Sequence, residues 1–251
     1  MSLADNGRAL TWDGCLNIRD LGGLPTNDGG MTRHGSVVRA DSVRQLSGDG
    51  WAALVGYGIG RIVDLRWHSE LAADPPGEFP VDTVHIPLFP ESTSDDWLAI
   101  DALDEAEPNP VVAKGAVYLA CLERFSSGFV TAVAAIVDTP KGGALVHCMG
   151  GKDRTGLVSA LLLRLAGVSI VDIAEDYAQS GENLRATTQG WIAAAADDAE
   201  RRRRERVAVT PASAMATVLD ELEARHGGVG EYLLHSGAEA EVVERARALL
   251  R

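Results

Sequence analysis

Apolar runs in the first 150 residues predict short strands. Residues 59–65 form a run rich in β-branched residues, and residues 144–148 (ALVHC) form a second apolar run behind a pair of glycines. Both runs are typical of buried strands. Residues 36–40 predict another short strand. Residues 81–88 alternate between apolar and polar positions, which favours a strand nearer the edge of a sheet.

Helical periodicity dominates the rest of the chain. Apolar residues recur at helical spacing after the 144–148 run, where we expect a helix that starts at Thr155 and ends at Gly167. Ser169 is suited to cap the next helix, since Asp172 stands at the capping-box spacing. The other predicted helices cover residues 47–55, 111–123, 128–138, 183–198, 211–225 and 238–250.

The order of these elements bounds the fold. Strands alternate with helices as far as residue 168, and residues 169–251 are helical throughout, so we expect one α/β domain over residues 1–251 with a helical C-terminal part. Residues 89–125 interrupt the pattern. Their first part, 89–114, is acidic and contains proline, with a weak helical signal at 97–103, and is expected to form a lid or an insertion.

Composition narrows the classes of partner. Acidic residues outnumber basic ones by 36 to 23, for a formal net charge of −13. Such a field repels polyanions, which argues against nucleic acid or an anionic membrane as a general partner. The 46% hydrophobic content is ordinary for a soluble protein, and no apolar run reaches the length of a membrane span. The oligomeric state leaves no trace in the sequence.

The cysteines indicate a reducing compartment. Cys15, Cys121 and Cys148 are too few and too scattered for a disulfide framework. The first residues lack the basic and then apolar regions of a signal peptide. We therefore expect a cytoplasmic protein, with non-classical secretion left open.

The segment HCMGGKDRTG at 147–156 carries the clearest chemistry. A buried strand delivers His147 and Cys148 into a glycine-containing loop, and a helix follows at once. Loop N–H groups and a helix N-terminus that converge on one point make an anion site. The Cys148–Arg154 spacing lets the loop curl around a phosphate, with the thiol beneath it and the guanidinium bound to two of its oxygens. The same field favours the thiolate, which is the form able to attack phosphorus.

This loop closely resembles the phosphate-binding loop of the bacterial tyrosine phosphatases with dual lipid specificity. Other segments resemble that family as well: NIRDLGG at 17–23, VVRADSVRQLS at 37–47, IVDLRWHSE at 62–70 and GGVGEYLLHSGA at 227–238. The resemblance implies the cysteine-phosphatase fold, in which helices flank a central, mostly parallel, twisted sheet. It also implies no metal and no organic cofactor. The substrate would be a phosphorylated protein or a phosphoinositide.

Site roles follow from the resemblance, position by position. Cys148 would be the nucleophile, Arg154 the phosphate clamp, and Thr155 the hydroxyl that hydrogen-bonds the sulfur. The phosphate would lie against the loop residues Met149, Gly150, Gly151, Lys152, Asp153 and Arg154, with Lys152 adding positive charge. His147 is expected to support Cys148 through a hydrogen bond rather than to act as an acid or base.

The general acid stays open between two aspartates. The resemblance favours Asp153, inside the loop. Asp64 is the second candidate, because it ends a buried strand and is expected near the cleft, although a structural pair with Arg66 explains it equally well. Glu70 is a further candidate for the wall of the cleft. Arg201 to Arg204 are expected to form a solvated helical face.

The expected function is hydrolysis of phosphomonoesters through a phospho-cysteine intermediate. Phosphotyrosine is the expected substrate, with phosphoserine, phosphothreonine and phosphoinositides as further possibilities. The alternative is a catalytically silent phosphate-binding module on the same fold. That alternative gives no reason for a thiol at position 148.

Overall fold

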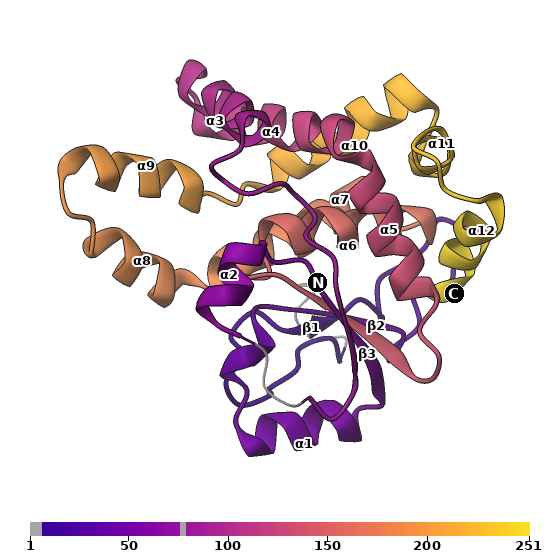
Figure 1. The fold of residues 1–251 in the computed structure, drawn as a ribbon. Helices are drawn as coiled ribbons and strands as arrows, with labels where there is room; N and C mark the ends of the chain where they lie inside the picture. The colour runs from indigo at the N-terminus through magenta and orange to yellow at the C-terminus, as the bar shows by residue number, and fades with distance from the viewer. Residues whose placement is uncertain (1–6, 76–78) are drawn as a thin grey trace.

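A five-stranded sheet forms the centre of the molecule. The computed structural model describes residues 7–75 and 79–251, and its strands follow the order β1-β2-β5-β3-β4 across the sheet (Figure 1). The short strand β1 is antiparallel to β2, and all other neighbours are parallel. The strands are β1 (Arg19–Asp20), β2 (Val37–Ala40), β3 (Ile59–Asp64), β4 (Asp82–His85) and β5 (Gly143–His147).

The three central strands end together. In the registers of β2, β5 and β3, His147 pairs with Ala40 on one side and with Asp64 on the other. In an open parallel sheet, ligands bind outside the carboxyl ends of the strands. Cys148 leaves β5 at this edge, so the sheet itself delivers the thiol to the side where a ligand would sit.

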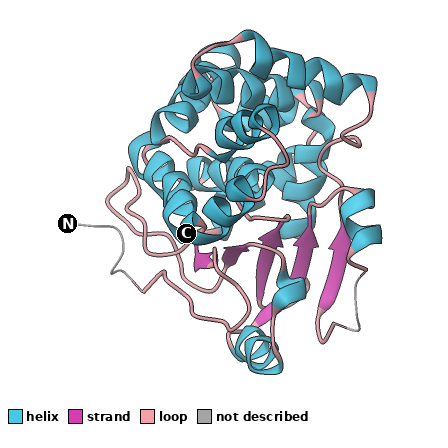
Figure 2. Ribbon diagram, turned by 90° about the vertical axis from the view of Figure 1, so that its left-hand side faces the viewer, coloured by secondary structure: helices cyan, strands magenta, loops and turns pink. Residues whose placement is uncertain are grey.

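Helices cover both faces of the sheet, as Figure 2 shows. One face packs against α1 (Gly48–Gly56) and the N-terminal segment, around Trp12, Leu54 and Ile62. The other face buries a larger core under most of the remaining helices. These are α5 (Ser126–Val137), α6 (Asp153–Leu165), α7 (Ile170–Asn183), α10 (Ala212–His226), α11 (Val229–His235) and α12 (Ala240–Leu249). The predicted class, a mostly parallel central sheet flanked by helices, is confirmed.

Residues 89–125 contain two helices, α3 (Asp95–Ala106) and α4 (Pro110–Arg124). The second helix contributes to the main core, because Tyr118, Cys121 and Leu122 are buried in it. Asn109 begins α4 by accepting a hydrogen bond from Val111 N–H. A lid function for this segment stays a prediction, but α4 itself packs as a core helix.

Two boundary predictions are wrong. The helix after the loop begins at Asp153 and not at Thr155, so Asp153 and Arg154 belong to its first turn. A continuous helix over 183–198 does not form: α7 runs to Asn183, α8 covers Arg185–Ala193, and α9 covers Asp198–Ala208. The break between α8 and α9 has a local cause, since the Asp197 side chain caps α9 by accepting from Glu200 N–H. The cap predicted at Ser169 is present and starts α7.

Helices α8 and α9 form a pair that extends from one side of the body, drawn in orange in Figure 1. A short helix, α2 (His68–Ala73), follows β3 and was not evident in the sequence. Within the described part of the chain, no single helix is long and apolar enough to cross a membrane. Helices α4 and α5 satisfy that test only as a pair, and they are bent by 79° at their junction.

Candidate active site

The loop 148–152 lies at the carboxyl end of β5, between the sheet and α6. Cys148 is only 3% exposed and Thr155 is fully buried, whereas Met149 is half-exposed at the mouth of the loop. Gly151 adopts a φ of +62°, and a Cβ at this position would lie 2.3 Å from the carbonyl oxygen of Ala40. The close turn of the loop against β2 therefore requires glycine at 151.

The carbonyl groups of three consecutive loop residues are held from outside the loop. Ser42 N–H donates to the carbonyl of Met149 at 2.9 Å. The amide of Asn17 donates to the carbonyl of Gly150 at 2.9 Å. The Arg39 guanidinium donates to the carbonyl of Gly151 at 2.8 Å. This last contact buries a charged side chain directly behind the loop.

These anchors orient the N–H groups of the loop. In a trans peptide the N–H points away from the carbonyl that precedes it. Because the carbonyls of residues 149 to 151 turn outward, the N–H groups of Gly150, Gly151 and Lys152 turn toward the centre of the loop. None of the hydrogen bonds among residues 7–75 and 79–251 uses these three N–H groups. With the N-terminus of α6, they form a cradle for an anion.

Arg154 forms a forked ion pair with Glu70 of α2. Its Nη1 and Nη2 atoms donate to the two carboxylate oxygens of Glu70, the second at 2.8 Å. Its Cζ atom lies 4.6 Å from the centre of the Trp67 ring. Glu70 also accepts from Trp67 N–H at 2.7 Å. Burial alone would lower the pKa of Arg154, but Glu70 and Cys148 outweigh it and raise the pKa above its usual value.

This ion pair leaves one edge of the guanidinium available. The guanidinium has five N–H groups, and Glu70 takes one from each terminal nitrogen. Leu65 O accepts from Nη1 at 3.4 Å. Among the described residues, the Nε–H and the second N–H of Nη2 have no acceptor. They lie side by side, which is the arrangement that binds two oxygens of a phosphate.

Asp153 lies beside Arg154 in the first turn of α6. Its Oδ1 accepts from the Tyr118 hydroxyl and lies 3.5 Å from Lys114 Nζ, and its Oδ2 lies 3.6 Å from Lys152 Nζ. Burial raises the pKa of Asp153, but Lys152, Lys114 and Tyr118 outweigh it and bring it to about 2. The carboxylate is therefore ionised at neutral pH when no ligand is bound.

The two lysines also hold the end of α9. Lys152 Nζ donates to the carbonyl of Val207 at 2.8 Å, and Lys114 Nζ donates to the same carbonyl at 3.1 Å. A helix C-terminus carries partial negative charge, so both cations are well placed there. Burial lowers the pKa of Lys152. Residues of the loop, of α4 and of α9 thus meet at one point.

Asp64 has a different environment from Asp153. Both of its oxygens accept from Arg66, at 2.8 to 3.0 Å. His147 lies 3.8 Å from Asp64 and bonds the carbonyl of Cys148 through Nδ1 at 3.0 Å. Burial lowers the pKa of His147, so the ring is neutral and Nδ1–H is the donor. Thr155 has no hydrogen-bond partner for its hydroxyl among the described residues.

The sequence did not reveal a buried charge cluster behind the loop. The carboxylate of Asp176 on α7 pairs with three arginines, namely Arg8, Arg19 and Arg39. Burial raises the pKa of Asp176, but the arginines lower it far below its usual value. Because Arg39 also bonds the loop, this cluster connects the NIRDLGG segment to the site. No local pattern signals it, since its members lie up to 168 residues apart.

A cavity of about 720 Å³ opens beside Asp153 and Arg154. Its apolar wall includes Trp67, Phe89 and Trp97, together with Val117 and Cys121. Phe89 stacks on Trp97, and Trp67 meets Trp97 edge to face. The rim is charged and includes Arg202, Arg203 and Arg206 of α9. Of the basic run, Arg201 to Arg203 are exposed, as the sequence indicates, whereas the Arg204 side chain is only 16% exposed and lies over the Trp191 ring. Arg202 and Arg203 also border the cavity. Arg206 ties α9 to α3 through Asp104 at 3.0 Å.

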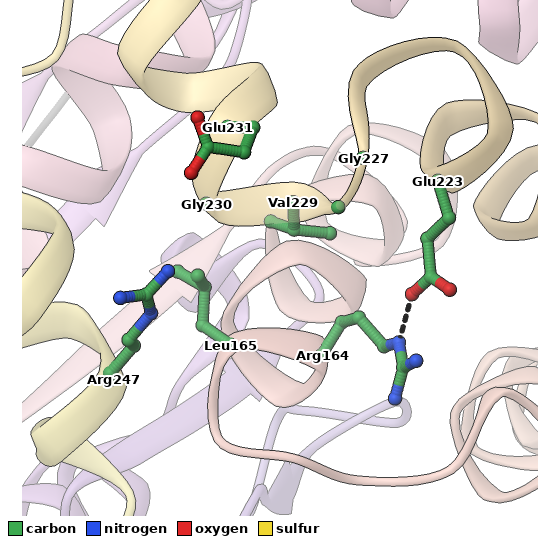
Figure 3. A pocket seen from close by; sticks show the side chains of 9 residues that line it. Arg164, Leu165, Glu223, Gly227, Val229, Gly230, Glu231 and Arg247 are labelled. Carbon is green, nitrogen blue, oxygen red and sulfur yellow. Dashed lines mark hydrogen bonds and ion pairs between the residues drawn. The ribbon is translucent and has the colours of Figure 1, made fainter.

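A second cavity, of about 330 Å³, lies between α6, α10 and α12 and is shown in Figure 3. Two arginines line it, Arg164 and Arg247. Arg164 pairs with Glu223 across the cavity, and Arg247 pairs with Glu244. Each of these two arginines is paired with a glutamate, and no cysteine or loop of the kind found at 148–152 is among the residues that line this cavity.

The fold and this loop define a phosphatase. Residues 10–251 match the tyrosine phosphatase family, and the chain belongs to that family. It is 27% identical to the triple specificity protein phosphatase PtpB of Mycobacterium tuberculosis, over 94% of this chain and 97% of that protein. It is 26% identical to a tyrosine-protein phosphatase of Nostoc commune, over 86% of this chain and 74% of that protein. The crystal structure of P. aeruginosa TpbA aligns with a TM-score of 0.37 at 16% identity, over 81% of this chain and 99% of that one.

Proposed function

We propose that the protein hydrolyses phosphotyrosine through a covalent phospho-cysteine on Cys148. The observation that carries this proposal is the cradle itself: loop N–H groups and a guanidinium edge that have no partner in the described part of the chain surround a buried thiol. A phosphate in the cradle would meet Cys148 from below and Arg154 from the side. Such a site stabilises the charge that develops on the phosphoryl oxygens during transfer.

The reaction has two steps. The Cys148 thiolate attacks phosphorus and forms an S–P bond while the P–O bond to the leaving group breaks, and that oxygen takes a proton from Asp153. Water then attacks phosphorus, the S–P bond breaks, and Asp153 recovers a proton from the water. The Thr155 hydroxyl has no hydrogen-bond partner within residues 7–75 and 79–251, which suits a hydrogen bond to the departing sulfur.

Asp153 is ionised in the free protein, so the substrate must help to protonate it. A bound phosphate dianion compensates the charge of Lys152 and Arg154, which are two of the groups that keep the pKa of Asp153 near 2. Their effect then weakens, and the pKa of the carboxyl rises toward the working pH. Asp64 is the weaker candidate, because Arg66 occupies both of its oxygens.

The cavity favours an aromatic phosphoester. Its wall of Trp67, Phe89 and Trp97 starts beside Asp153 and Arg154, where a leaving group would lie. An aromatic ring stacks well on such a surface. The M. tuberculosis relative is named a triple specificity phosphatase, and we propose phosphoserine, phosphothreonine and phosphoinositides as further substrates beside phosphotyrosine. A thiolate nucleophile and the free Cys15 and Cys121 suit a reducing compartment such as the cytoplasm.

The test is hydrolysis of para-nitrophenyl phosphate in EDTA and a thiol reductant. We expect wild-type turnover without added metal, and loss of turnover in Cys148→Ser, because a serine alkoxide is not available at neutral pH. Tight phosphate binding with no turnover in well-folded wild type would instead support the silent phosphate-binding module.

A further inference from the structure

A buried tyrosine from α4 contacts the proposed acid. The Tyr118 hydroxyl bonds Oδ1 of Asp153, and the whole Tyr118 side chain is only 3% exposed. Its oxygen also lies 2.9 Å from the hydroxyl of Tyr177 on α7. The two rings meet edge to face, with centroids 5.9 Å apart. Three elements far apart in the sequence therefore converge on one carboxylate.

The direction of these hydrogen bonds is fixed by the carboxylate. An ionised carboxylate accepts only, so Tyr118 gives its single proton to Asp153. Tyr118 must then accept from Tyr177, which donates. Burial raises the pKa of Tyr118 well above its usual value, and the charge on Asp153 adds to this effect. Tyr118 therefore stays protonated and acts as a donor throughout the working pH range.

The two oxygens of Asp153 are not equivalent. Oδ1 is taken by Tyr118 and faces Lys114 at 3.5 Å. Among the described residues, Oδ2 has no neutral donor, and it lies near Lys152 at 3.6 Å. The Asp153 side chain is 36% exposed and lines the cavity beside Arg154. The oxygen left to exchange a proton with a leaving group is Oδ2.

We propose that Tyr118 is a positioning residue for the reaction: its hydroxyl holds Oδ1 of Asp153, so that Oδ2 carries the proton to the leaving group. This inference rests on the proposed function, with Asp153 as the acid. The other titratable or charged groups around this carboxylate are Lys114 and Cys121 of α4, Tyr177 of α7, and Lys152 and Arg154 of the loop and α6.

The test compares three tyrosine-to-phenylalanine variants, each of which removes one buried hydroxyl. Tyr118→Phe removes the contact with Asp153. Tyr177→Phe removes only the donor behind Tyr118. Tyr232→Phe removes a distant hydroxyl, which donates to Leu122 O at 2.7 Å. Pre-steady-state phosphorylation rates are measured with phenyl phosphate, a poor leaving group, and with 2,4-dinitrophenyl phosphate, a good one.

We expect Tyr118→Phe to slow phosphorylation by phenyl phosphate about tenfold and to leave the dinitrophenyl ester within about twofold. The rate of phosphorylation of Tyr177→Phe by phenyl phosphate should lie between the rates of Tyr118→Phe and wild type. The rate of Tyr232→Phe should match that of wild type. In the pH–rate profile, the high-pH limb reports the loss of the Asp153 proton. This limb should move to higher pH in Tyr118→Phe, because the ionised carboxylate loses a hydrogen-bond donor and its pKa rises. A purely structural role would slow both esters equally and leave this limb in place.

Two outcomes distinguish failure of the positioning role of Tyr118 from failure of the proposed phospho-cysteine mechanism. A phospho-enzyme trapped in wild type, with an unchanged leaving-group ratio in Tyr118→Phe, would overturn the positioning role alone. Failure to trap a phospho-enzyme by acid quench while wild type turns over 2,4-dinitrophenyl phosphate would overturn the phospho-cysteine mechanism and the positioning role together. If Tyr118→Phe does not fold, Tyr118→3-fluorotyrosine keeps the ring and strengthens the donor. The high-pH limb of the pH–rate profile of this variant should then move to lower pH. A limb that stays in place would overturn the inference.

Discussion

At the scale of single residues, the two aspartates differ in what their oxygens contact. Asp153 borders the cavity next to Arg154, whereas Asp64 is enclosed by Arg66 and His147. We expect Asp153→Asn to lower kcat/KM for poor leaving groups by about 10²–10⁴-fold and to spare good ones. Asp64→Asn should lower kcat/KM for both to a similar extent, because it disturbs Arg66 rather than proton transfer. A series of aryl phosphates with graded leaving-group pKa measures the difference.

The matched asparagine keeps the shape of each side chain, so the comparison isolates the carboxyl group. Leaving-group dependence in Asp64→Asn, with none in Asp153→Asn, would exchange the two roles. Equal dependence in both variants would mean that neither aspartate is the single acid.

Single residues close together in the sequence were the predictable part of the site. Cys148 and Lys152 lie in the loop and Asp153 and Arg154 in the first turn of α6, so strand, loop and helix geometry alone brings these four residues together. Their partners were not predictable in the same way. Asn17, Arg39 and Tyr118 reach the loop from 35 to 133 residues away. A local sequence pattern cannot reveal contacts between residues so far apart in the sequence, because these contacts depend on how the sheet and helices pack.

At the scale of elements, the short helix α2 presents Glu70 to Arg154. We expect Glu70→Gln to lower kcat about 10- to 100-fold, because the guanidinium loses the forked partner that fixes its free edge. The helix should persist, since the amide oxygen still accepts from Trp67 N–H. Steady-state kinetics, together with circular dichroism, measures both effects.

Glu91→Gln is the matched control for Glu70→Gln. Glu91 accepts from Ser69 on the same helix, at the surface, and makes no contact with Arg154 among the described residues. Its kcat should stay close to that of wild type. If Glu70→Gln also keeps wild-type kcat, Arg154 is held by its other contacts, Leu65 O and the Trp67 ring.

Element types were more predictable than element ends. Apolar runs located β3 and β5, and an apolar stripe at helical spacing located α5, because each of these elements is buried in the core. The start of α6 was placed two residues late, since Asp153 and Arg154 look like loop residues in composition. Strand β1 was missed because two residues, Arg19 and Asp20, carry no alternating pattern.

At the scale of the whole molecule, one carboxylate joins distant parts of the chain. Asp176 on α7 pairs with Arg8 before the sheet, Arg19 on β1 and Arg39 on β2. Its side chain is 1% exposed. The cluster closes the sheet edge against the helical layer and reaches the loop through Arg39. An isolated Asp in a helix gives no sign in sequence of three arginine partners.

We expect Asp176→Asn to destabilise the fold by about 3–5 kcal/mol at neutral pH, because it leaves three buried cations without their anion. The folded pKa of Asp176 is far below the unfolded value of about 3.9. Its contribution is therefore complete above that unfolded pKa and is lost as the pH falls below it. The stability gap between wild type and Asp176→Asn should narrow on acidification, which urea unfolding at neutral pH and near pH 3 would measure.

Asp82→Asn provides the surface comparison for this last prediction. Asp82 pairs with Arg61 at 2.6 Å, but its side chain is 47% exposed, so its loss should cost about 0–1 kcal/mol. Similar losses in both variants would show that the Asp176 cluster contributes no more than a surface pair. A large loss in Asp176→Asn that does not change with pH would show that packing, rather than charge, holds this cluster.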